Sequence, residues 1–360
     1  MVSAVTAEDL LARDLDEAVA RGGALWSELR GARMFITGGT GFVGTWLLET
    51  FCSANARLRL GATATVLSRR PEAFAAKVPH VANDAAITLL RGDVRAIPSQ
   101  DGSFSHVIHA ATDARPPGSA DERRAAFDTI VNGTREVLDF ARRAGASRFL
   151  LTSSGAVYGR QPSELTNVPE DYYGGPDPTD PNAFYGEGKR AAETLCALHA
   201  EERFTPTIAR CFAFVGPYLP LDLHFAVGNF IRDALAGGPI RVTGDGTPYR
   251  SYMYASDLAL WLWTILLRGA AARPYNVGSS ASLSIGELAT VVAAQIGGVE
   301  VRIASPAPPG VAPARYVPSV DRAERELGLR CTVPLADGIR RTARWHSGSL
   351  VDATRQRTSK

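Results

Sequence analysis

The chain has 360 residues, of which 45% are hydrophobic and 21% charged, and its formal net charge at pH 7 is +2. This composition is typical of a globular protein and excludes a disordered chain. The 39 basic and 37 acidic residues nearly balance, and the basic ones form no long block. The sequence therefore gives no electrostatic indication of nucleic-acid binding.

The N-terminal segment is acidic and has no apolar core, so it does not resemble a signal peptide. The most apolar stretch, residues 258–267, is too short to span a bilayer and is expected to be a buried helix. We therefore expect a cytoplasmic protein without membrane contact. Four cysteines without a CxxC pair indicate free thiols in a reducing compartment and no metal site; they are Cys52, Cys196, Cys211 and Cys331.

Apolar side chains at helical spacing predict an N-terminal helical appendage over residues 1–30. Strands and helices then alternate. The predicted strands are 33–37, 62–68, 86–94, 106–112, 148–154 and 205–216, and the predicted helices are 42–55, 71–78, 121–145 and 182–202. Strands that are apolar nearly throughout indicate a parallel sheet covered on both faces. The sequence thus predicts a Rossmann-type doubly wound α/β fold over residues 31–215.

The remaining segments are less regular. Residues 160–181 are rich in Pro, Gly, Asp and Tyr and predict a long surface loop. After residue 215 the pattern loosens, which predicts a smaller C-terminal substrate lobe, mostly within 216–346 and interleaved with the sheet. The Pro-rich stretch 304–319 is expected to be irregular. Residues 347–360 are expected to form a mobile tail.

The stretch TGGTGFVG, residues 37–44, stands between the first predicted strand and the helix after it. One of its glycines permits a positive φ, another lets the backbone approach a ligand, and a third lets the helix lie against the strand. The helix N-terminus then offers N–H groups to a pyrophosphate. A glycine-rich turn without a ligand is the alternative. The predicted cofactor contacts are Gly38, Thr40, Gly41, Phe42 and Val43.

The end of the second predicted strand bears on the choice of cofactor. NAD-selective sites carry an acidic residue there, which accepts from the ribose 2′-OH, whereas this chain has Ser68, Arg69 and Arg70. Arg69 is suited to pair with a 2′-phosphate, which favours NADP over NAD; the alternative is a solvated surface charge. Asp93 is suited to accept from an adenine amino group, and its alternative is a turn cap.

Tyr185 and Lys189 lie four residues apart and share one face of the predicted helix 182–202. The ammonium is expected to lower the pKa of the phenol. Such a tyrosine can exchange a proton with a hydroxyl whose carbon exchanges hydride with nicotinamide. Ser154 ends a predicted strand and is expected to hydrogen-bond the same oxygen. A Tyr–Lys pair at this spacing is common by chance, but the glycine turn and Ser154 favour the catalytic interpretation.

Together these stretches resemble the extended short-chain dehydrogenases/reductases of the NAD-dependent epimerase/dehydratase family, which act mainly on nucleotide sugars. The resemblance runs from about residue 33 to 346, through TGGTGFVG, GDV, HAAT, TSSGAVYG, YGEGKRAAE, GDGTPYRSYMYASDLA, YNVGS and DRAERELG. It implies a catalytic triad of Ser154, Tyr185 and Lys189, with Lys189 also holding the nicotinamide ribose. It also implies a homodimer that forms through the predicted helices 121–144 and 182–202.

The resemblance implies further binding residues. Arg250 is expected to bind the sugar-nucleotide pyrophosphate and Asn229 to contact the nucleotide end. The remaining contacts implied are those of Val94, Ala110, Ala111 and Thr112 with the cofactor, and of Arg315 with the substrate.

Three departures from the family pattern bear on the reaction. The family's dehydratases carry an Asp-Glu pair directly after the triad Ser/Thr, and its decarboxylases tend to carry a Glu there. In this chain Gly155 and Ala156 occupy those positions, which disfavours both reactions because neither side chain transfers protons. Ala213 stands where the family usually has Asn, and the Ser68-Arg69 pair replaces the acidic residue of NAD-retaining epimerases.

The sequence therefore predicts an NAD(P)-dependent nucleotide-sugar epimerase, with C4 as the favoured carbon. Transient oxidation to a ketone and return of the hydride need no acid or base beyond the triad. The alternative is an NADPH-dependent reductase of a 4-keto-6-deoxy nucleotide sugar, which Arg69 favours. A third interpretation, a cofactor-sensing protein without catalysis, gives no reason for Tyr185 to stand beside Lys189.

Overall fold

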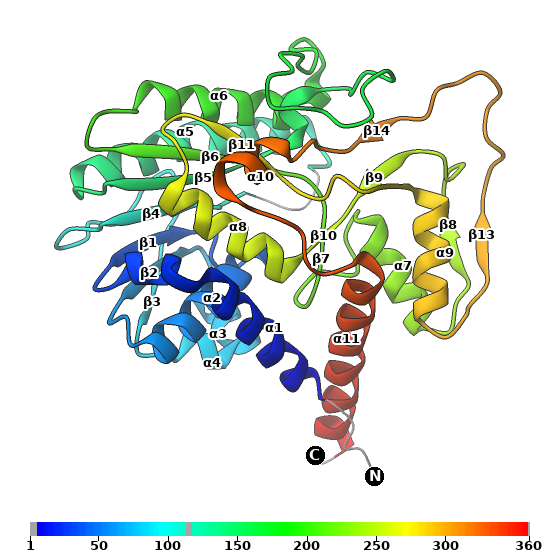
Figure 1. The fold of residues 1–360 in the computed structure, drawn as a ribbon, viewed down its shortest axis with the longest axis horizontal. Coiled ribbons are helices and arrows are strands. Elements are labelled where there is room, and N and C mark those ends of the chain that lie inside the picture. The colour runs from blue at the N-terminus through cyan, green and yellow to red at the C-terminus, as the bar shows by residue number, and fades with distance from the viewer. Residues whose placement is uncertain (1–5, 113–116, 359–360) are drawn as a thin grey trace.

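The computed structural model describes residues 6–112 and 117–358, with side chains up to residue 348. Its centre is a seven-stranded parallel sheet in the order β11-β6-β5-β4-β1-β2-β3 (Figure 1). This is the Rossmann strand order with one strand added at an edge, so the predicted fold class is confirmed. The strands are β1 (Arg33–Thr37), β2 (Thr63–Ser68), β3 (Ile87–Arg91), β4 (His106–His109), β5 (Arg148–Ser154), β6 (Thr205–Cys211) and β11 (Pro274–Val277).

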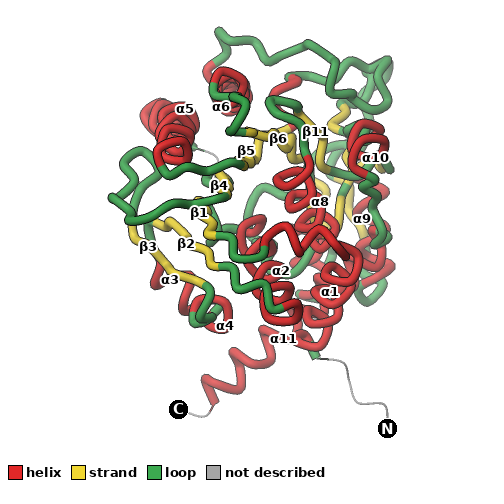
Figure 2. The backbone as a smooth tube through the Cα atoms, turned by 60° about the vertical axis from the view of Figure 1, so that its left-hand side comes forward, coloured by secondary structure: helices red, strands yellow, loops and turns green. Residues whose placement is uncertain are grey.

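Helices cover both faces of the sheet, as Figure 2 shows from another side. On one face lie α5 (Ala120–Arg143) and α6 (Phe184–Leu198); on the other lie α2 (Phe42–Leu58) and α8 (Ala255–Arg268). All but the last residue of α8 are buried, so the predicted burial of 258–267 is confirmed. No helix in the described part of the chain is both long and apolar enough to cross a membrane.

Short helical segments connect these layers. They are α3 (Pro71–Lys77), α4 (Pro79–Ala82), the 3₁₀ turns η2 (Gly155–Tyr158) and η3 (Pro181–Ala183), and α10 (Asp321–Leu327). The predicted helix 182–202 is η3 followed by α6, which ends at Leu198.

The N-terminal residues pack against the C-terminal helix. They form α1 (Ala7–Gly22) and η1 (Gly23–Leu29). Asp14 of α1 is fully buried and accepts hydrogen bonds from Tyr254 and from Arg341 of α11 (Leu335–Thr358). Burial raises the pKa of Asp14, while Tyr254 and Arg341 oppose the rise. Helix α11 extends through most of the segment 347–360 that was expected to form a mobile tail; residues 359–360 lie outside the described part.

The second lobe is built from segments on both sides of α8 and β11, so the chain returns to the main sheet within it (Figure 1). The predicted interleaving is thus seen, and the boundary at residue 215 is not a clean division. The lobe contains α7 (Ala226–Leu235), α9 (Ile285–Gln295), the parallel pair β8 (Ile240–Val242) and β13 (Val301–Ile303), and a three-stranded sheet of β12 (Ser282–Ser284), β9 (Tyr249–Ser251) and β14 (Arg315–Tyr316).

Two predicted elements were wrong in detail. The strand expected over 205–216 ends at Cys211, and Phe214–Val215 is a separate strand, β7, which pairs with β10 (Met253–Tyr254). The stretch 304–319 is not irregular throughout, because Arg315–Tyr316 pairs in parallel with β9. In both cases the partner strand comes from a distant part of the chain, which local sequence patterns do not reveal.

Candidate active site

The candidate residues gather where the parallel strands end. The glycine turn follows β1, Ser68 ends β2, Ala110 follows β4 and Ser154 ends β5. In open α/β sheets, ligands bind in the crevice outside these carboxyl ends. The sheet topology therefore brings together residues that lie more than a hundred positions apart.

Three of the four glycines in the turn, Gly38, Gly41 and Gly44, serve different purposes. Gly38 has a positive φ of 72°, and a Cβ there would overlap the backbone of Ala110. A Cβ on Gly44 would overlap the carbonyl of Gly38, so a side chain there would separate the helix from the turn. Gly41 is different: its φ is −85°, and the nearest atom to a Cβ would be 3.6 Å away. The fold requires glycine at positions 38 and 44 but not at 41.

The space over Gly41 lies at the start of α2. Gly41 is the N-cap of this helix, and no side chain caps it in the described chain. The N–H groups of Phe42 and Val43 belong to this first turn, where a helix favours anions. An open space beside an uncapped helix N-terminus fits a dinucleotide pyrophosphate. The residues present therefore fit the cofactor that the sequence predicts.

Three other predicted cofactor contacts, Thr40, Ser68 and Asp93, form hydrogen bonds within the chain. Thr40 Oγ1 lies 3.4 Å from Ser68 Oγ, which also accepts from the N–H of Arg70. Both carboxylate oxygens of Asp93 accept from the Arg95 guanidinium, at 2.9 and 3.0 Å, and this contact lowers the pKa of Asp93. Asp93 also accepts from the N–H of Arg95, as the turn-cap alternative expects.

The remaining predicted cofactor residues differ in how deeply they are buried. Val94 is buried in the core beneath α5, where a Cβ on Gly133 would meet it. The N–H of Ala110 donates to the carbonyl of Thr37, which fixes the backbone after β4. Ala111 is half-buried and Thr112 exposed.

The structure brings the predicted triad together. Lys189 is buried on α6, and its Nζ donates to the carbonyl of Thr152 at 2.8 Å and lies 5.9 Å from the centroid of the Tyr185 ring. Burial lowers the pKa of Lys189 to about 8. The hydroxyl of Ser154 accepts from the N–H of Ala156 at 3.2 Å, and it acts to lower the pKa of the Tyr185 phenol.

One electrostatic prediction was wrong for this structure. The pKa of Tyr185 is raised, because burial disfavours the charged phenolate, and the hydrogen bond from Ser154 opposes the rise. The Lys189 ammonium was expected to lower this pKa. Instead, the ammonium donates a hydrogen bond to the carbonyl of Thr152 and lies over the aromatic ring of Tyr185. The phenol is therefore protonated at neutral pH in the chain alone.

On the lobe side, β9 and β14 form two arginine–tyrosine pairs at successive register positions, which project to opposite faces of the strand pair. Arg250 and Tyr316 are register partners, and the Arg250 guanidinium lies 5.8 Å from the centroid of the Tyr316 ring. The Arg315 guanidinium stacks over Tyr249 at 4.3 Å. Tyr316 was not predicted as a site residue, because two strand residues inside a Pro-rich stretch give no local signal.

Asn229 stands apart from these pairs. It is half-buried on α7, and its amide oxygen accepts from Arg232 at 3.2 Å. The predicted substrate residues are thus distributed over one helix and two strands of the lobe.

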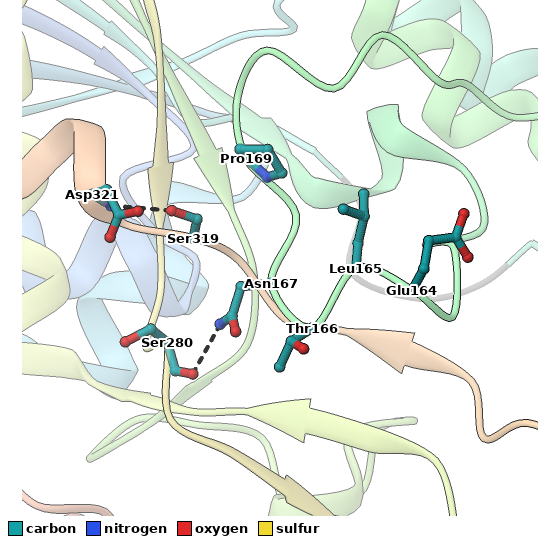
Figure 3. A pocket seen from close by; sticks show the side chains of 8 residues that line it. All are labelled: Glu164, Leu165, Thr166, Asn167, Pro169, Ser280, Ser319 and Asp321. Carbon is teal, nitrogen blue, oxygen red and sulfur yellow. Dashed lines mark hydrogen bonds between the residues drawn. The ribbon is translucent and has the colours of Figure 1, made fainter.

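A separate polar pocket of about 470 Å³ lies beside the loop 160–181 (Figure 3). Asn167 lines the pocket, and its side-chain amide donates to the carbonyls of Ser280 and Pro318. None of the triad residues lines this pocket, so we do not assign the predicted chemistry to it. Its lining residues are Glu164, Leu165, Thr166, Asn167, Pro169, Ser280, Ser319 and Asp321.

The glycine cradle and the Ser–Tyr–Lys arrangement on a Rossmann sheet define an extended short-chain dehydrogenase/reductase. The model of the NAD dependent epimerase/dehydratase family matches residues 34–278. The chain belongs to this family, as its resemblance indicated, and its cofactor is accordingly a nicotinamide dinucleotide.

Comparison with individual proteins agrees with this family. The chain is 32% identical over 326 residues to UDP-glucuronic acid decarboxylase 1 of Xenopus tropicalis, covering 90% of this chain and 74% of that protein. It is similar in structure to the dTDP-glucose 4,6-dehydratase DesIV of Streptomyces venezuelae, solved with NAD bound, with a TM-score of 0.71, 26% identity, and coverage of 88% and 97% of the two chains. The fold is also that of UDP-glucose 4-epimerase of Thermotoga maritima, at a TM-score of 0.72, 21% identity, and coverage of 88% and 99%.

Proposed function

We propose that this protein is a nucleotide-sugar 4-epimerase. The observation that carries the proposal is a complete Ser154–Tyr185–Lys189 arrangement followed directly by Gly155 and Ala156. Epimerisation through a ketone needs one group to move the hydroxyl proton and a hydride acceptor. It needs no second acid or base.

In this proposal each residue of the triad has a separate role in the proton transfer. Tyr185 takes the proton from the sugar hydroxyl and later returns it, and Ser154 holds the same oxygen. Lys189, with a pKa of about 8, supplies positive charge over the Tyr185 ring and is held by its hydrogen bond to the carbonyl of Thr152. The nicotinamide, when bound, supplies the reversible hydride acceptor. Because Tyr185 begins protonated in the chain alone, the loaded site has to favour its phenolate.

We assign the substrate to the class of UDP-sugars. The curated relative in Xenopus acts on UDP-glucuronic acid by its name, and the Thermotoga epimerase was solved with UDP-glucose. In this assignment Arg250 binds the pyrophosphate, Arg315 contacts the substrate from the neighbouring strand, and Asn229 contacts the nucleotide base. Both arginines are half-buried residues on neighbouring strands, which suits recognition of phosphates.

Decarboxylation is the second candidate, since relatives at 32% identity carry it in their names. Against it stand Gly155 and Ala156, which offer no carboxylate beside Ser154. Reduction of a 4-keto sugar is the third, on the basis of Ser68 and Arg69.

One experiment separates these reactions. The purified protein is denatured and its released nicotinamide identified; the native protein is then incubated with a panel of UDP-sugars without added cofactor and followed by ¹H NMR. An epimerase yields the C4 epimer with no net change in reduced-nicotinamide absorbance. Loss of CO₂ from UDP-glucuronic acid would establish decarboxylation, and consumption of added NADPH by a 4-keto sugar would establish reduction. Either of these outcomes without epimer formation would refute the proposal.

We also propose that the protein is a homodimer formed through α5 and α6. Phe127 on α5 and Leu198 at the end of α6 are exposed large apolar residues, at 37% and 75%. Light scattering on the purified protein should give twice the chain mass of 38.4 kDa. Leu198→Glu should shift it toward the monomer, and a monomeric wild type would exclude this assembly.

A further inference from the structure

Two successive turns of α6 are attached to successive residues of β5. Lys189 Nζ donates to the carbonyl of Thr152 at 2.8 Å, and one turn further along the helix Glu193 accepts from the hydroxyl of Ser153 at 2.5 Å. Ser153 is buried, and the residue after it, Ser154, belongs to the triad. The two hydrogen bonds therefore fix how the helix that carries the triad lysine lies against the strand that ends at Ser154.

Glu193 is itself held by an arginine of the neighbouring strand. Arg210 of β6 donates from Nε and Nη2 to the two oxygens of the Glu193 carboxylate, at 3.0 and 2.7 Å. Arg210 and Ser153 are register partners, so both side chains project to the face of the sheet that α6 covers. The Arg210 and Glu193 side chains are 14% and 11% exposed, which makes this a largely buried ion pair. One carboxylate thus joins β5, β6 and α6.

The other side of the Arg210 guanidinium also contacts groups of the chain. Its Nη1 donates to the hydroxyl of Tyr158 at 2.8 Å and to the carbonyl of Glu170 at 3.2 Å. The Tyr158 hydroxyl in turn donates to the side chain of Asn276, which is the register partner of Arg210 on β11. Ser153, Arg210 and Asn276 therefore stand in line across three strands, and the guanidinium is fixed by partners on both sides.

Stability alone does not explain a buried ion pair at this place. Desolvation of the two charges offsets most of their attraction, and apolar side chains of similar volume often stabilise a core at least as well. Glu193 lies one turn from Lys189 on the same face of α6. Burial lowers the pKa of Lys189 to about 8, and the Glu193 carboxylate opposes this fall. The pair therefore acts on the triad through its contacts and through its charge.

We propose that Glu193 is a positioning residue for the triad: its hydrogen bond with Ser153 keeps the end of β5 in place against the helix face that carries Tyr185. Arg210 holds the carboxylate in the orientation that this hydrogen bond requires. The inference rests on the proposed function, because the triad carries the proton transfer assigned above. It gives Glu193 and Ser153 a role in the rate of the reaction and none in substrate binding.

The first test is Ser153→Ala, which removes the hydroxyl that donates to Glu193 and leaves the ion pair intact. We expect kcat to fall about 10-fold with KM for the UDP-sugar nearly unchanged, because a small displacement of the triad slows the reaction without altering the substrate contacts. The control is Thr207→Val, which removes a fully buried hydroxyl that donates from β6 to the carbonyl of Phe149 on β5. Thr207 stands three positions before Arg210 and so projects to the opposite face of the sheet, away from α6. Wild-type kcat in Ser153→Ala, or an equal loss in the control, would refute the role.

The second test separates positioning from stability. Glu193→Leu combined with Arg210→Met replaces the ion pair by apolar side chains of similar volume, so the unfolding midpoint in urea should stay near that of the wild type. The kcat should nevertheless be about 10-fold low, because Ser153 has lost its partner on α6. Adding Ser153→Ala to the double variant should cost no further activity, since effects that share one contact do not add. A double variant with wild-type kcat, or a further loss on adding Ser153→Ala, would show that the pair does not act through Ser153.

A third measurement needs no turnover. The chain has three lysines, which are Lys77, Lys189 and Lys360. In protein labelled with ¹³Cε-lysine, the signal of Lys189 is the one that disappears in Lys189→Arg. This signal should shift in Ser153→Ala, because the ammonium is held by the carbonyl of the preceding residue, and stay in place in Thr207→Val.

The lysine signal also distinguishes a failure of this inference from a failure of the proposed function. An identical Lys189 signal in wild type and Ser153→Ala would overturn the inference whichever reaction the protein catalyses. A wild type that forms no epimer from any UDP-sugar would instead refute the proposed function, and the Lys189 signal would still decide whether Ser153 holds β5 in place.

Discussion

The glycine turn and the β9–β14 pair both build the site, but by different physical means. The turn is one continuous stretch, residues 37–44, whose geometry is set by backbone atoms that leave no room for Cβ. The β9–β14 pair joins Arg250 to Tyr316 across a large separation in the chain and holds them by ring stacking and register. Backbone sterics tolerate little change, whereas stacked side chains can be exchanged. We therefore expect the turn to preserve cofactor binding and the lobe to decide reaction and substrate.

The largest expected effect comes from Tyr185 of the triad, on helix α6. Tyr185→Phe removes the only hydroxyl that we assign to proton transfer, so kcat should fall about 10³-fold. The unfolding midpoint and the content of bound nicotinamide should remain near wild type. Tyr173→Phe, at a position that is 91% exposed, is the matched control and should retain full activity. A Tyr185→Phe variant with more than about a tenth of wild-type kcat would exclude the proposed proton transfer.

The next effect separates packing from ligand binding within the turn. Gly44→Ala puts a methyl group against the carbonyl of Gly38 and should lower the free energy of unfolding by about 3 kcal/mol. Gly41→Ala meets no atom closer than 3.6 Å and should leave stability nearly unchanged while weakening dinucleotide binding. Urea denaturation and calorimetric titration of nucleotide-free protein measure the two quantities. Unchanged dinucleotide affinity in Gly41→Ala would show that the space over Gly41 is not the cradle.

The same contrast explains how much of the molecule the sequence could predict. The alternation of apolar strands and helices predicted the doubly wound sheet, because period and turn chemistry are local. Ser154, Tyr185 and Lys189 could be found because each lies at a strand end or on one helix face. Their grouping follows because α6 packs against β5, where Lys189 Nζ donates to the carbonyl of Thr152.

The parts that could not be predicted depend on long-range pairing or burial. Nothing local distinguishes Tyr316 in its Pro-rich stretch, because its strand exists only where β9 meets it. The break after Cys211 has the same cause, since β7 pairs with β10. The raised pKa of Tyr185 was missed because spacing reports the distance to Lys189 but not the loss of water around the phenol.

A lobe-side substitution should change substrate binding without affecting the turn. Arg250→Met removes the guanidinium that we assign to the pyrophosphate, so KM for the UDP-sugar should rise about 30-fold. Arg241→Met is the matched control, because Arg241 is an exposed arginine on β8 of the same lobe. Bound nicotinamide should be retained in both variants. An unchanged KM in Arg250→Met would move the pyrophosphate site elsewhere.

The free energy of unfolding should depend on pH because of buried histidines in the central sheet, and not because of the exposed His224 in the second lobe. His109 is buried on β4 between Thr37 and Thr134, and burial lowers its pKa from 6.5 to about 3. A depressed histidine pKa stabilises the fold above pH 6.5, and this contribution is lost as the pH falls toward 3. At about pH 5 the loss should reach about 2 kcal/mol, with His106 adding to the slope because burial lowers its pKa to about 4.

Urea denaturation at about pH 7.5 and pH 5 measures this dependence. His109→Gln should flatten the difference between the two pH values, even if it lowers stability at both. His224→Gln, on the exposed surface of the lobe, should leave the difference as in wild type. If the wild type has the same free energy of unfolding at both pH values, protonation of His109 does not destabilise the fold, and this prediction is wrong.

The smallest expected effect concerns the choice of dinucleotide at the end of β2. If Arg69 pairs with a 2′-phosphate, Arg69→Ala should weaken NADP binding about 10-fold and leave NAD binding unchanged, because only NADP carries that group. Ser68→Asp is the complementary variant: a carboxylate that accepts from the ribose 2′-OH should favour NAD and repel the phosphate. Calorimetric titration of nucleotide-free protein with both dinucleotides gives the two ratios. Equal NADP affinity in wild type and Arg69→Ala would show that Arg69 is a surface charge. The predicted preference for NADP would then be wrong, but the assignment of the dinucleotide site over Gly41 would not be affected.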